Sequence, residues 1–248
     1  MALPMPMPTP MTTSTTTDPA QLRLWQLVSP ALPVGAFSYS EGLEVLQQQG
    51  QLASSAALQA WLLAELERGA VAIEAAALAP LAQAIERLRG GDLAAAVALL
   101  DLDGWLQAQR EAAEVRAQQR QMGQSLLQLL ADLQGPLLPH PVVGAVDLKA
   151  LAWPAAFAWA GVCAQLGAPA LQQAYLYGWV ANQISAAVRL VPLGPTEGQR
   201  AQWTLASTIA VRAEALAAAD PRSLWSGGVG AGLAQLQHAE LYSRLFRS

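Results

Sequence analysis

The sequence predicts an all-α protein that forms a single globular domain of roughly ten packed helices. Apolar residues recur three and four positions apart over long stretches, whereas alternating strand patterns are nearly absent. Prolines and glycines lie mostly between these stretches, where they end one helix before the next begins. Of the 248 residues, 53% are hydrophobic and 13% are charged, which supplies enough apolar surface for one large core.

The first three helices are predicted from their cap residues. A helix over 19–28 begins with an aspartate N-cap and a proline at its first position. Ser38 and Glu41 have the spacing of a capping box, which predicts a second helix that ends before Gly50. Serine also caps the third helix, whose apolar positions between 58 and 66 have helical spacing.

The middle of the chain carries the longest periodic signal. A fourth helix is predicted over 71–89, with Pro80 as a kink or break, and a short fifth helix over 92–100. From Trp105 to Leu133, apolar residues alternate three and four apart. This spacing predicts one long helix packed lengthwise against its neighbours.

Prolines and glycines divide the last part of the chain. Three further helices are predicted over 154–166, 170–190 and 197–219. The glycine-rich stretch 227–232 is interpreted as a hinge. We therefore expect three parts: a disordered N-terminal arm (1–18), an all-helical domain (19–226), and a glycine hinge with a partner-binding C-terminal tail (227–248).

The least generic stretch is 27–50, a proline-bounded loop that leads into a helix. Its two prolines disfavour helix in the residues before them, and its glycine permits a tight turn. A simple turn would need neither both prolines nor a run of polar and aromatic side chains. Six residues of this loop are candidate partner contacts: Pro33, Gly35, Phe37, Ser38, Tyr39 and Ser40.

Composition narrows the function classes. The net charge is −4 and no Lys/Arg cluster precedes the last few residues, which argues against nucleic acid as a partner. The small charged surface favours burial against another protein. Cys163 is the only cysteine, which excludes an internal disulfide and indicates a reducing compartment, so we expect a cytoplasmic location. The arm over 1–18 lacks the basic start and apolar core of a signal peptide.

A membrane span is disfavoured, although no charged residue lies between Lys149 and Arg189. The continuous apolar run within this window, 150–164, is shorter than the roughly 20 residues that a bilayer needs, and it contains Pro154. Buried helices of an all-α protein therefore explain the window better than lipid does.

The sequence contains no recognisable catalytic or metal motif. Its two histidines, His140 and His238, and its single cysteine are too few for a closed metal site in one chain. The stretch after Ser226 lacks the strand and lysine of a phosphate loop. Arg110 and Arg116 are expected to pair with neighbouring glutamates at the surface. No cofactor is predicted and an enzyme is disfavoured, which leaves an interaction protein.

Interface anchors gather in the tail. Aromatic, leucine and arginine side chains alternate there: Tyr242, Arg244, Leu245, Phe246 and Arg247. Because they follow a predicted hinge, we expect them to remain outside the core and to order on a partner. Glu44 and Arg189 can each be interpreted either as a partner contact or as an ordinary helix residue. In the second interpretation, Arg189 interacts favourably with the negative end of the helix dipole.

Four segments of the chain resemble the UreF family of urease accessory proteins. They are SPALPVGAFSYSEGLE (29–44), REAAEVRAQQRQMGQSLLQLL (110–130), NQISAAVRLVPLGPTEGQR (182–200) and HAELYSRLFRS (238–248). The chain departs from the family pattern at Pro195, at Ala112 and in the order of His238, Ala239 and Glu240.

The resemblance implies an all-α homodimer that takes part in nickel insertion into urease. It implies binding to a UreD/UreH-type accessory protein, to a UreG-type GTPase and, through that complex, to the urease apoprotein. It places Tyr242 to Ser248 at the UreD-type partner, and Glu44 and Arg189 on the face that meets the GTPase. Scaffolding is the leading hypothesis, and regulation of the GTPase is the alternative. A stand-alone enzyme for a small apolar ligand is a third hypothesis, which no motif supports.

Overall fold

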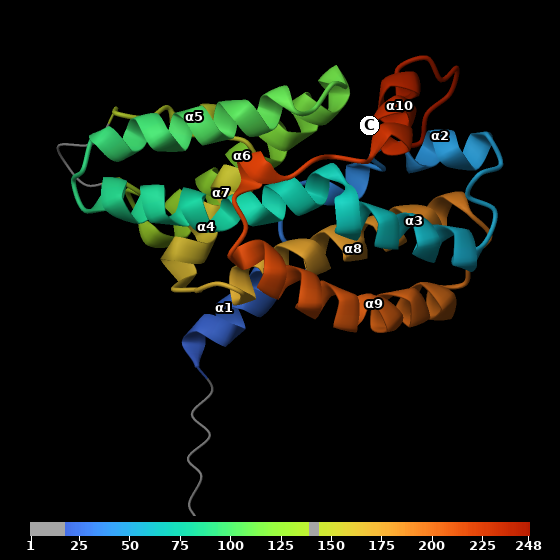
Figure 1. Ribbon diagram of the computed structural model, residues 1–248, viewed down its shortest axis with the longest axis horizontal. Coiled ribbons are helices and arrows are strands. Elements are labelled where there is room, and N and C mark those ends of the chain that lie inside the picture. The colour runs from blue at the N-terminus through green and yellow to red at the C-terminus, as the bar shows by residue number, and fades with distance from the viewer. Residues whose placement is uncertain (1–17, 139–143) are drawn as a thin grey trace, which may run out of the picture.

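The computed structural model describes residues 18–138 and 144–248 as a single packed all-α domain, which confirms the predicted fold class. Residues 1–17 of the arm predicted over 1–18, and His140, lie outside the described residues. Ten α-helices are described (Figure 1): α1 (Pro19–Leu27), α2 (Leu43–Gln48), α3 (Ser55–Arg68), α4 (Ala70–Arg89), α5 (Ala94–Ala108), α6 (Ala113–Gln134), α7 (Trp153–Ala164), α8 (Ala170–Leu190), α9 (Pro195–Ala217) and α10 (Val229–His238). Three short 3₁₀ turns accompany them: Ala36–Ser38, Leu148–Ala150 and Pro221–Ser223.

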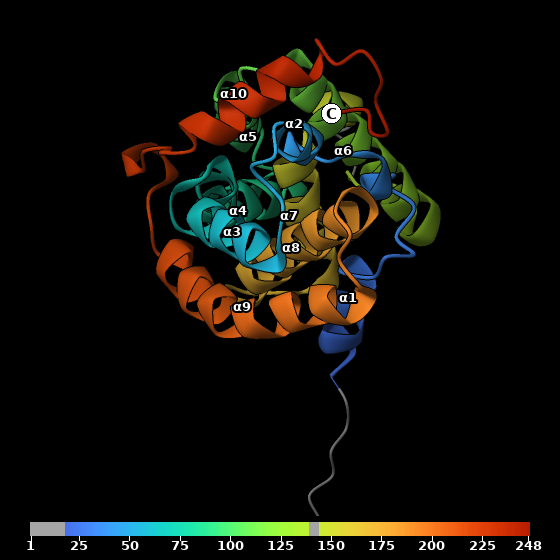
Figure 2. The same cartoon turned by 90° about the vertical axis from the view of Figure 1, so that its right-hand side faces the viewer.

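The centre of the domain is α7, the helix with the least polar sequence. Residues 154–161 are all buried, because this helix has no polar face to present to water. Seen end-on, α7 lies inside the bundle among α4, α6 and α8 (Figure 2). The continuous apolar run of the uncharged window, 150–164, therefore lies largely in the interior of the domain.

Among the described residues, no single helix has both the length and the apolar composition of a membrane span. The adjoining helices α3 and α4 meet that criterion only as a pair, with a bend of 41° between them.

The expected capping box at Ser38 and Glu41 is wrong. Helix α2 begins at Leu43 with Gly42 as its N-cap, and no side chain caps it. The physical reason is that the Glu41 carboxylate is buried and accepts hydrogen bonds from the side chains of Gln118 and Trp179, so it cannot reach back to a helix amide. Ser38 ends the 3₁₀ turn that follows Gly35, whose φ of 74° meets the expectation of a tight turn there.

The single helix predicted from Trp105 is also wrong, because the chain breaks between α5 and α6. At the break, Arg110 turns inward and forms an ion pair with Glu74 of α4 at 2.6 Å. Arg110 is therefore buried, and the expectation that it pairs at the surface was wrong. Pro80 lies within α4 without ending it, and α9 begins at Pro195, two residues before the predicted start at 197.

The C-terminal region differs most from expectation. Gly230 and Gly232 belong to α10, and the Gly227 N–H donates to the Arg68 carbonyl at 2.7 Å, so this stretch is ordered structure and the hinge interpretation was wrong. Helix α10 packs against α2, and the residues after it return to the domain (Figure 1). Phe246 is 4% exposed and packs in the core, which corrects the expectation that the tail stays outside it.

Candidate functional site

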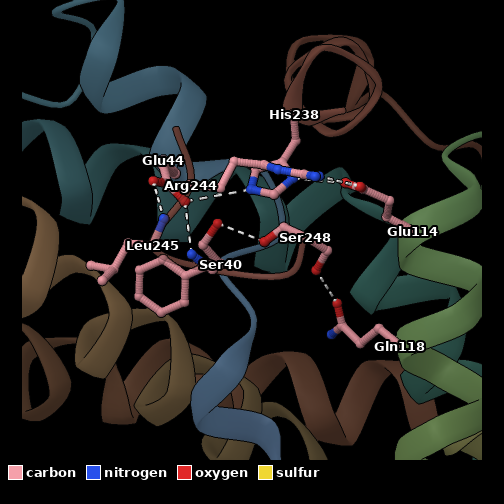
Figure 3. Close-up of polar contacts among 9 residues, drawn as sticks. Ser40, Glu44, Glu114, Gln118, His238, Arg244, Leu245 and Ser248 are labelled. Carbon is pink, nitrogen blue, oxygen red and sulfur yellow. Dashed lines mark hydrogen bonds and ion pairs between the residues drawn. The ribbon is translucent and has the colours of Figure 1, made fainter. Parts of the chain in front are cut away.

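The tail meets the loop before α2 through two neighbouring groups of polar contacts, one around Glu44 and His238 and one joining Ser40, Ser248 and Gln118 (Figure 3). We call this assembly the tail clamp; it comprises residues 37–44, Glu114, Gln118, Arg189 and residues 238–248. It draws together all four of the segments that the sequence singled out, although they are separated by up to 208 positions. Gly42 allows the start of α2 to lie close to α10, because a Cβ at this position would be 3.1 Å from the Cβ of Ala234 in α10.

Glu44 holds the tail backbone. One carboxylate oxygen accepts the Leu245 N–H at 2.7 Å, and the other accepts the Phe246 N–H at 3.0 Å. Hydrogen bonds to a carboxylate are stronger than those between neutral groups. These two bonds therefore fix the direction of the backbone at Leu245 and Phe246. Glu44 is buried, so its interpretation as a solvated helix residue was wrong.

His238, at the end of α10, lies between two carboxylates and is fully buried. Its Nδ1 is 2.7 Å from a Glu114 oxygen, and its Nε2 is 3.4 Å from a Glu44 oxygen. Glu114 also accepts a hydrogen bond from Arg244 at 2.6 Å. Each ring nitrogen of His238 therefore faces a different carboxylate. The sequence pattern gave His238 no role, because its partners come from α2 and α6.

Ser248 lies against Ser40 and forms hydrogen bonds with it. The backbone oxygen of Ser248 accepts three hydrogen bonds, from the Ser40 N–H (2.7 Å), the Ser40 hydroxyl (2.7 Å) and the Glu41 N–H (3.1 Å). The Ser248 hydroxyl donates to Gln118 at 2.6 Å, and the Arg247 N–H donates to the Ser38 carbonyl at 2.9 Å. The polar run of the loop therefore receives the tail of the same chain.

Arg189, in the last turn of α8, joins the loop and the tail. Its guanidinium donates to the Phe37 carbonyl at 2.8 Å and lies 4.4 Å from the centre of the Phe246 ring. The second contact is a cation–π interaction, which adds to the hydrogen bond in holding both segments. Arg189 thus has a structural role in addition to its place near the negative end of the α8 dipole.

Comparison with known protein families and sequences gives one consistent result. The family model UreF matches residues 52–206. A protein of Thermosynechococcus vestitus named "Urease accessory protein UreF" is 42% identical over 235 residues, which cover 94% of this chain and 99% of that protein. Proteins with the same name from Alkalilimnicola ehrlichii and Nostoc sp. are 38% and 40% identical, over 92% and 94% of this chain and 96% and 97% of their own lengths. The chain belongs to the UreF family.

The residues expected to meet partners fall into two groups within this UreF chain. Five of them are buried in the clamp: Tyr39, Ser40, Glu44, Phe246 and Ser248. The larger exposed side chains are Phe37 (70% exposed), Leu245 (54%) and Tyr242, whose side chain is fully exposed; Arg189, Arg244 and Arg247 are also exposed. Pro33 and Gly35 lie in the loop that leads to Phe37.

A second polar cluster lies beneath the clamp. Glu74 accepts hydrogen bonds from Arg110 (2.6 Å), Tyr175 (2.8 Å) and Gln119 (3.2 Å). Burial raises the pKa of Glu74, and the Arg110 guanidinium opposes that rise. Burial and the neighbouring Glu74 also raise the pKa of Tyr175. Sequence reasoning missed this cluster, because its members lie on α4, α6, α8 and the loop before α6.

The clamp does not form a convergent metal site. The two ring nitrogens of His238 face different carboxylates, so these groups do not point at one common position. Over residues 18–138 and 144–248, no group of three or more His, Cys, Asp or Glu side chains is placed to hold a metal ion.

Proposed function

We propose that this chain is a non-catalytic accessory protein of urease maturation. It scaffolds a complex of a UreD/UreH-type accessory protein and a UreG-type GTPase for nickel insertion into the urease apoprotein. Membership of the UreF family supports the role in urease maturation. The observation that supports a binding function is the tail clamp, which presents Phe37, Tyr242 and Leu245 to solvent.

Preorganisation is the physical basis of this proposal. Glu44, Arg189 and Ser40 anchor the tail, so Tyr242 and Leu245 project from a segment that is already ordered. Partner binding then costs less conformational entropy than it would with a free tail, because the tail is already ordered. Exposed aromatic and arginine side chains on such a segment are typical interface hot spots.

We further propose that the chain forms a homodimer in the cytoplasm and binds neither nucleic acid nor a membrane. Exposed apolar side chains on α9, Trp203 (86% exposed) and Val211 (69%), are compatible with a second protein surface away from the clamp. Two copies of the chain would then hold two GTPase subunits in one complex.

Co-purification with a UreD-type partner tests the scaffold. We expect Tyr242→Ala combined with Leu245→Asp to abolish the complex, since both side chains are exposed and neither anchors the tail. Trp225→Ala is the matched control, because Trp225 is an exposed aromatic residue outside the clamp. Size exclusion with light scattering measures the stoichiometry, and circular dichroism verifies the fold. Unchanged binding by the double variant would contradict the assignment of this face.

The alternative function is regulation of GTP hydrolysis in the UreG-type partner. An arginine supplied to a GTPase accelerates hydrolysis by roughly a thousandfold or more. Arg189 is committed to Phe37 and Phe246, whereas Arg200 on α9 is exposed and makes no side-chain polar contact within the described residues. Equal GTP turnover by the partner with Arg200→Ala and with the unaltered chain would exclude Arg200 from this role.

A further inference from the structure

We propose that the pocket beneath the tail clamp binds an organic cation that carries N–H donors, an alkylammonium or guanidinium group. The pocket has a volume of about 520 Å³ and extends from Phe37 and Arg189 at the surface to Glu41 and Glu74 in the interior. Three features of its lining support this assignment: an uncompensated carboxylate, unpartnered amide oxygens and aromatic walls.

The carboxylate is that of Glu41. It accepts hydrogen bonds from the neutral donors Gln118 (2.7 Å) and Trp179 (3.1 Å), and within the described residues no cation pairs with it. Glu74, the other acidic residue of the lining, is compensated by Arg110. Glu41 also has a φ of 51°, a strained value for a residue other than glycine, of the kind that clusters at ligand sites. Among the described residues of the lining, Glu41 is therefore the carboxylate that has no ion-pair partner.

The unpartnered oxygens belong to Gln119 and Gln183, which line the pocket and are 3% and 2% exposed. The amide nitrogen of Gln119 donates to Glu74, which identifies its oxygen as the free acceptor. The Gln183 oxygen also has no partner among the described residues. Both acceptors are therefore available to a donor that enters the pocket; the Gln202 amide nitrogen, which also lines it, is a donor without a partner among the described residues.

The walls suit a cation that also has an apolar stem. Five aromatic side chains line the inner part: Tyr39, Trp153, Phe157, Tyr175 and Trp179. Aromatic faces attract ammonium and guanidinium groups. A divalent metal ion prefers several converging carboxylate, imidazole or thiolate ligands. Among the described residues, the lining contains no histidine or cysteine, and its two carboxylates, Glu41 and Glu74, belong to no group of three or more side chains placed to hold a metal ion.

The indole N–H of Trp179 is a direct reporter, because it donates to Glu41 inside the pocket. We would follow its nuclear magnetic resonance signal, assigned with Trp179→Phe, while titrating the isolated chain with n-butylammonium or methylguanidinium at constant ionic strength. We expect a saturable shift with both cations and none with n-butanol. No saturable shift, or an equal shift with n-butanol, would overturn the proposal. Displacement of both cations by low concentrations of Ni²⁺ would overturn it in favour of a metal site.

Two variants and one control locate the site. Gln183→Met removes an acceptor that has no partner, so the fold should be unaffected while binding weakens by roughly tenfold. Glu41→Gln should abolish binding. Glu197→Gln removes an exposed carboxylate near the mouth and should leave binding unchanged. Equal affinity of Gln183→Met and the unaltered chain would overturn the placement.

The cation can be a free metabolite or a lysine or arginine side chain of a docked protein, and a second arm distinguishes these sources. If a side chain is the occupant, the complex with the UreD-type or UreG-type partner no longer binds n-butylammonium. If a free cation is the occupant, the complex binds it as the isolated chain does. The first titration needs no partner, so failure of the scaffold proposal and failure of this one are separate results.

Discussion

Ser40 and Ser248, 208 positions apart, are joined by two hydrogen bonds of 2.7 Å, from the N–H and the hydroxyl of Ser40 to the backbone oxygen of Ser248. Gln118 extends this contact inward, since it accepts from the Ser248 hydroxyl and donates to Glu41 in the pocket. The tail, the loop before α2 and the interior pocket therefore form one connected polar network. A change at the tail has a physical route to the pocket through two side chains.

Glu44→Ala should release the tail while the helical domain stays folded. The change removes the acceptor of two backbone N–H groups and leaves His238 with a single carboxylate partner. Hydrogen bonds to a charged group contribute roughly 1.5–3 kcal/mol each, so local opening should become easier by at least about 2 kcal/mol. Hydrogen exchange of the Leu245 and Phe246 amides measures this local opening of the tail. Glu240→Ala, an exposed change in the same region, should leave these amides protected.

Arg110→Met should lower the free energy of unfolding by roughly 3–5 kcal/mol, because it leaves the Glu74 carboxylate buried without its cation. The double variant Arg110→Met with Glu74→Gln should lose less than the sum of the single losses, since no unpaired charge remains. Urea denaturation measures both. Arg87→Met is the control: its ion pair with Asp92 is exposed, so a loss below about 1 kcal/mol is expected. Additive losses in the double variant would contradict the ion pair's role.

Stability should fall as the pH rises through the range from about 4.5 to 7. Burial raises the pKa of Glu65 from 4.5 to about 7, and burial raises the pKa of Asp103 from 3.8 to about 6. Between the unfolded and folded values the folded chain holds more protons, so deprotonation favours unfolding; below the unfolded values there is no loss. The Glu65 contribution is roughly 3 kcal/mol at full deprotonation.

Glu65→Gln tests this assignment by removing the ionisable group while keeping its shape. Thermal denaturation between pH 4 and 8 should become markedly flatter than in the unaltered chain. Glu67→Gln, which removes an exposed carboxylate from the same helix, should not change the profile. An unaltered profile in Glu65→Gln would assign the pH dependence to other groups.

Two glycine-to-alanine changes should have opposite signs. Gly42 has a φ of 92°, and a Cβ on it would lie 3.1 Å from Ala234 and from the Gln235 nitrogen, so Gly42→Ala should destabilise by about 1–3 kcal/mol and loosen α10. Gly104 lies within α5 with open space beside it, so Gly104→Ala should stabilise by about 0.5–1 kcal/mol. Melting temperatures compare the two. Equal effects would show that the approach of α10 to α2 is looser than described.

Local signals in the sequence predicted the fold class well. The Asp18 side chain accepts the Ala20 N–H at 3.0 Å, and the Ser54 side chain accepts the Ala57 N–H at 3.2 Å, as expected of N-caps. The alanine-rich run after Pro154 proved to be the buried centre of the bundle. These features depend on neighbours within a few positions, which a linear pattern contains.

Failures occurred where a side chain binds a distant one. Glu41 follows the spacing of a capping box, yet its carboxylate points to Gln118 and Trp179 from other helices. Arg110 resembles a surface cation beside Glu111, yet it pairs with Glu74, 36 positions earlier. Local spacing cannot distinguish a solvated charge from one that is desolvated and paired, because the partner is chosen by packing.

The sequence alone was enough to predict an all-α chain. The segments that resemble the UreF family also contain most of the clamp residues. The tertiary structure was needed to show that Phe246 of the tail packs in the core and that Glu44 and His238 help to anchor the tail. The reason is physical: helix formation follows from the period of apolar residues and from local caps. The docking of a tail depends on backbone donors and acceptors that every residue carries, so its partner is set by the positions of helices far apart in the chain.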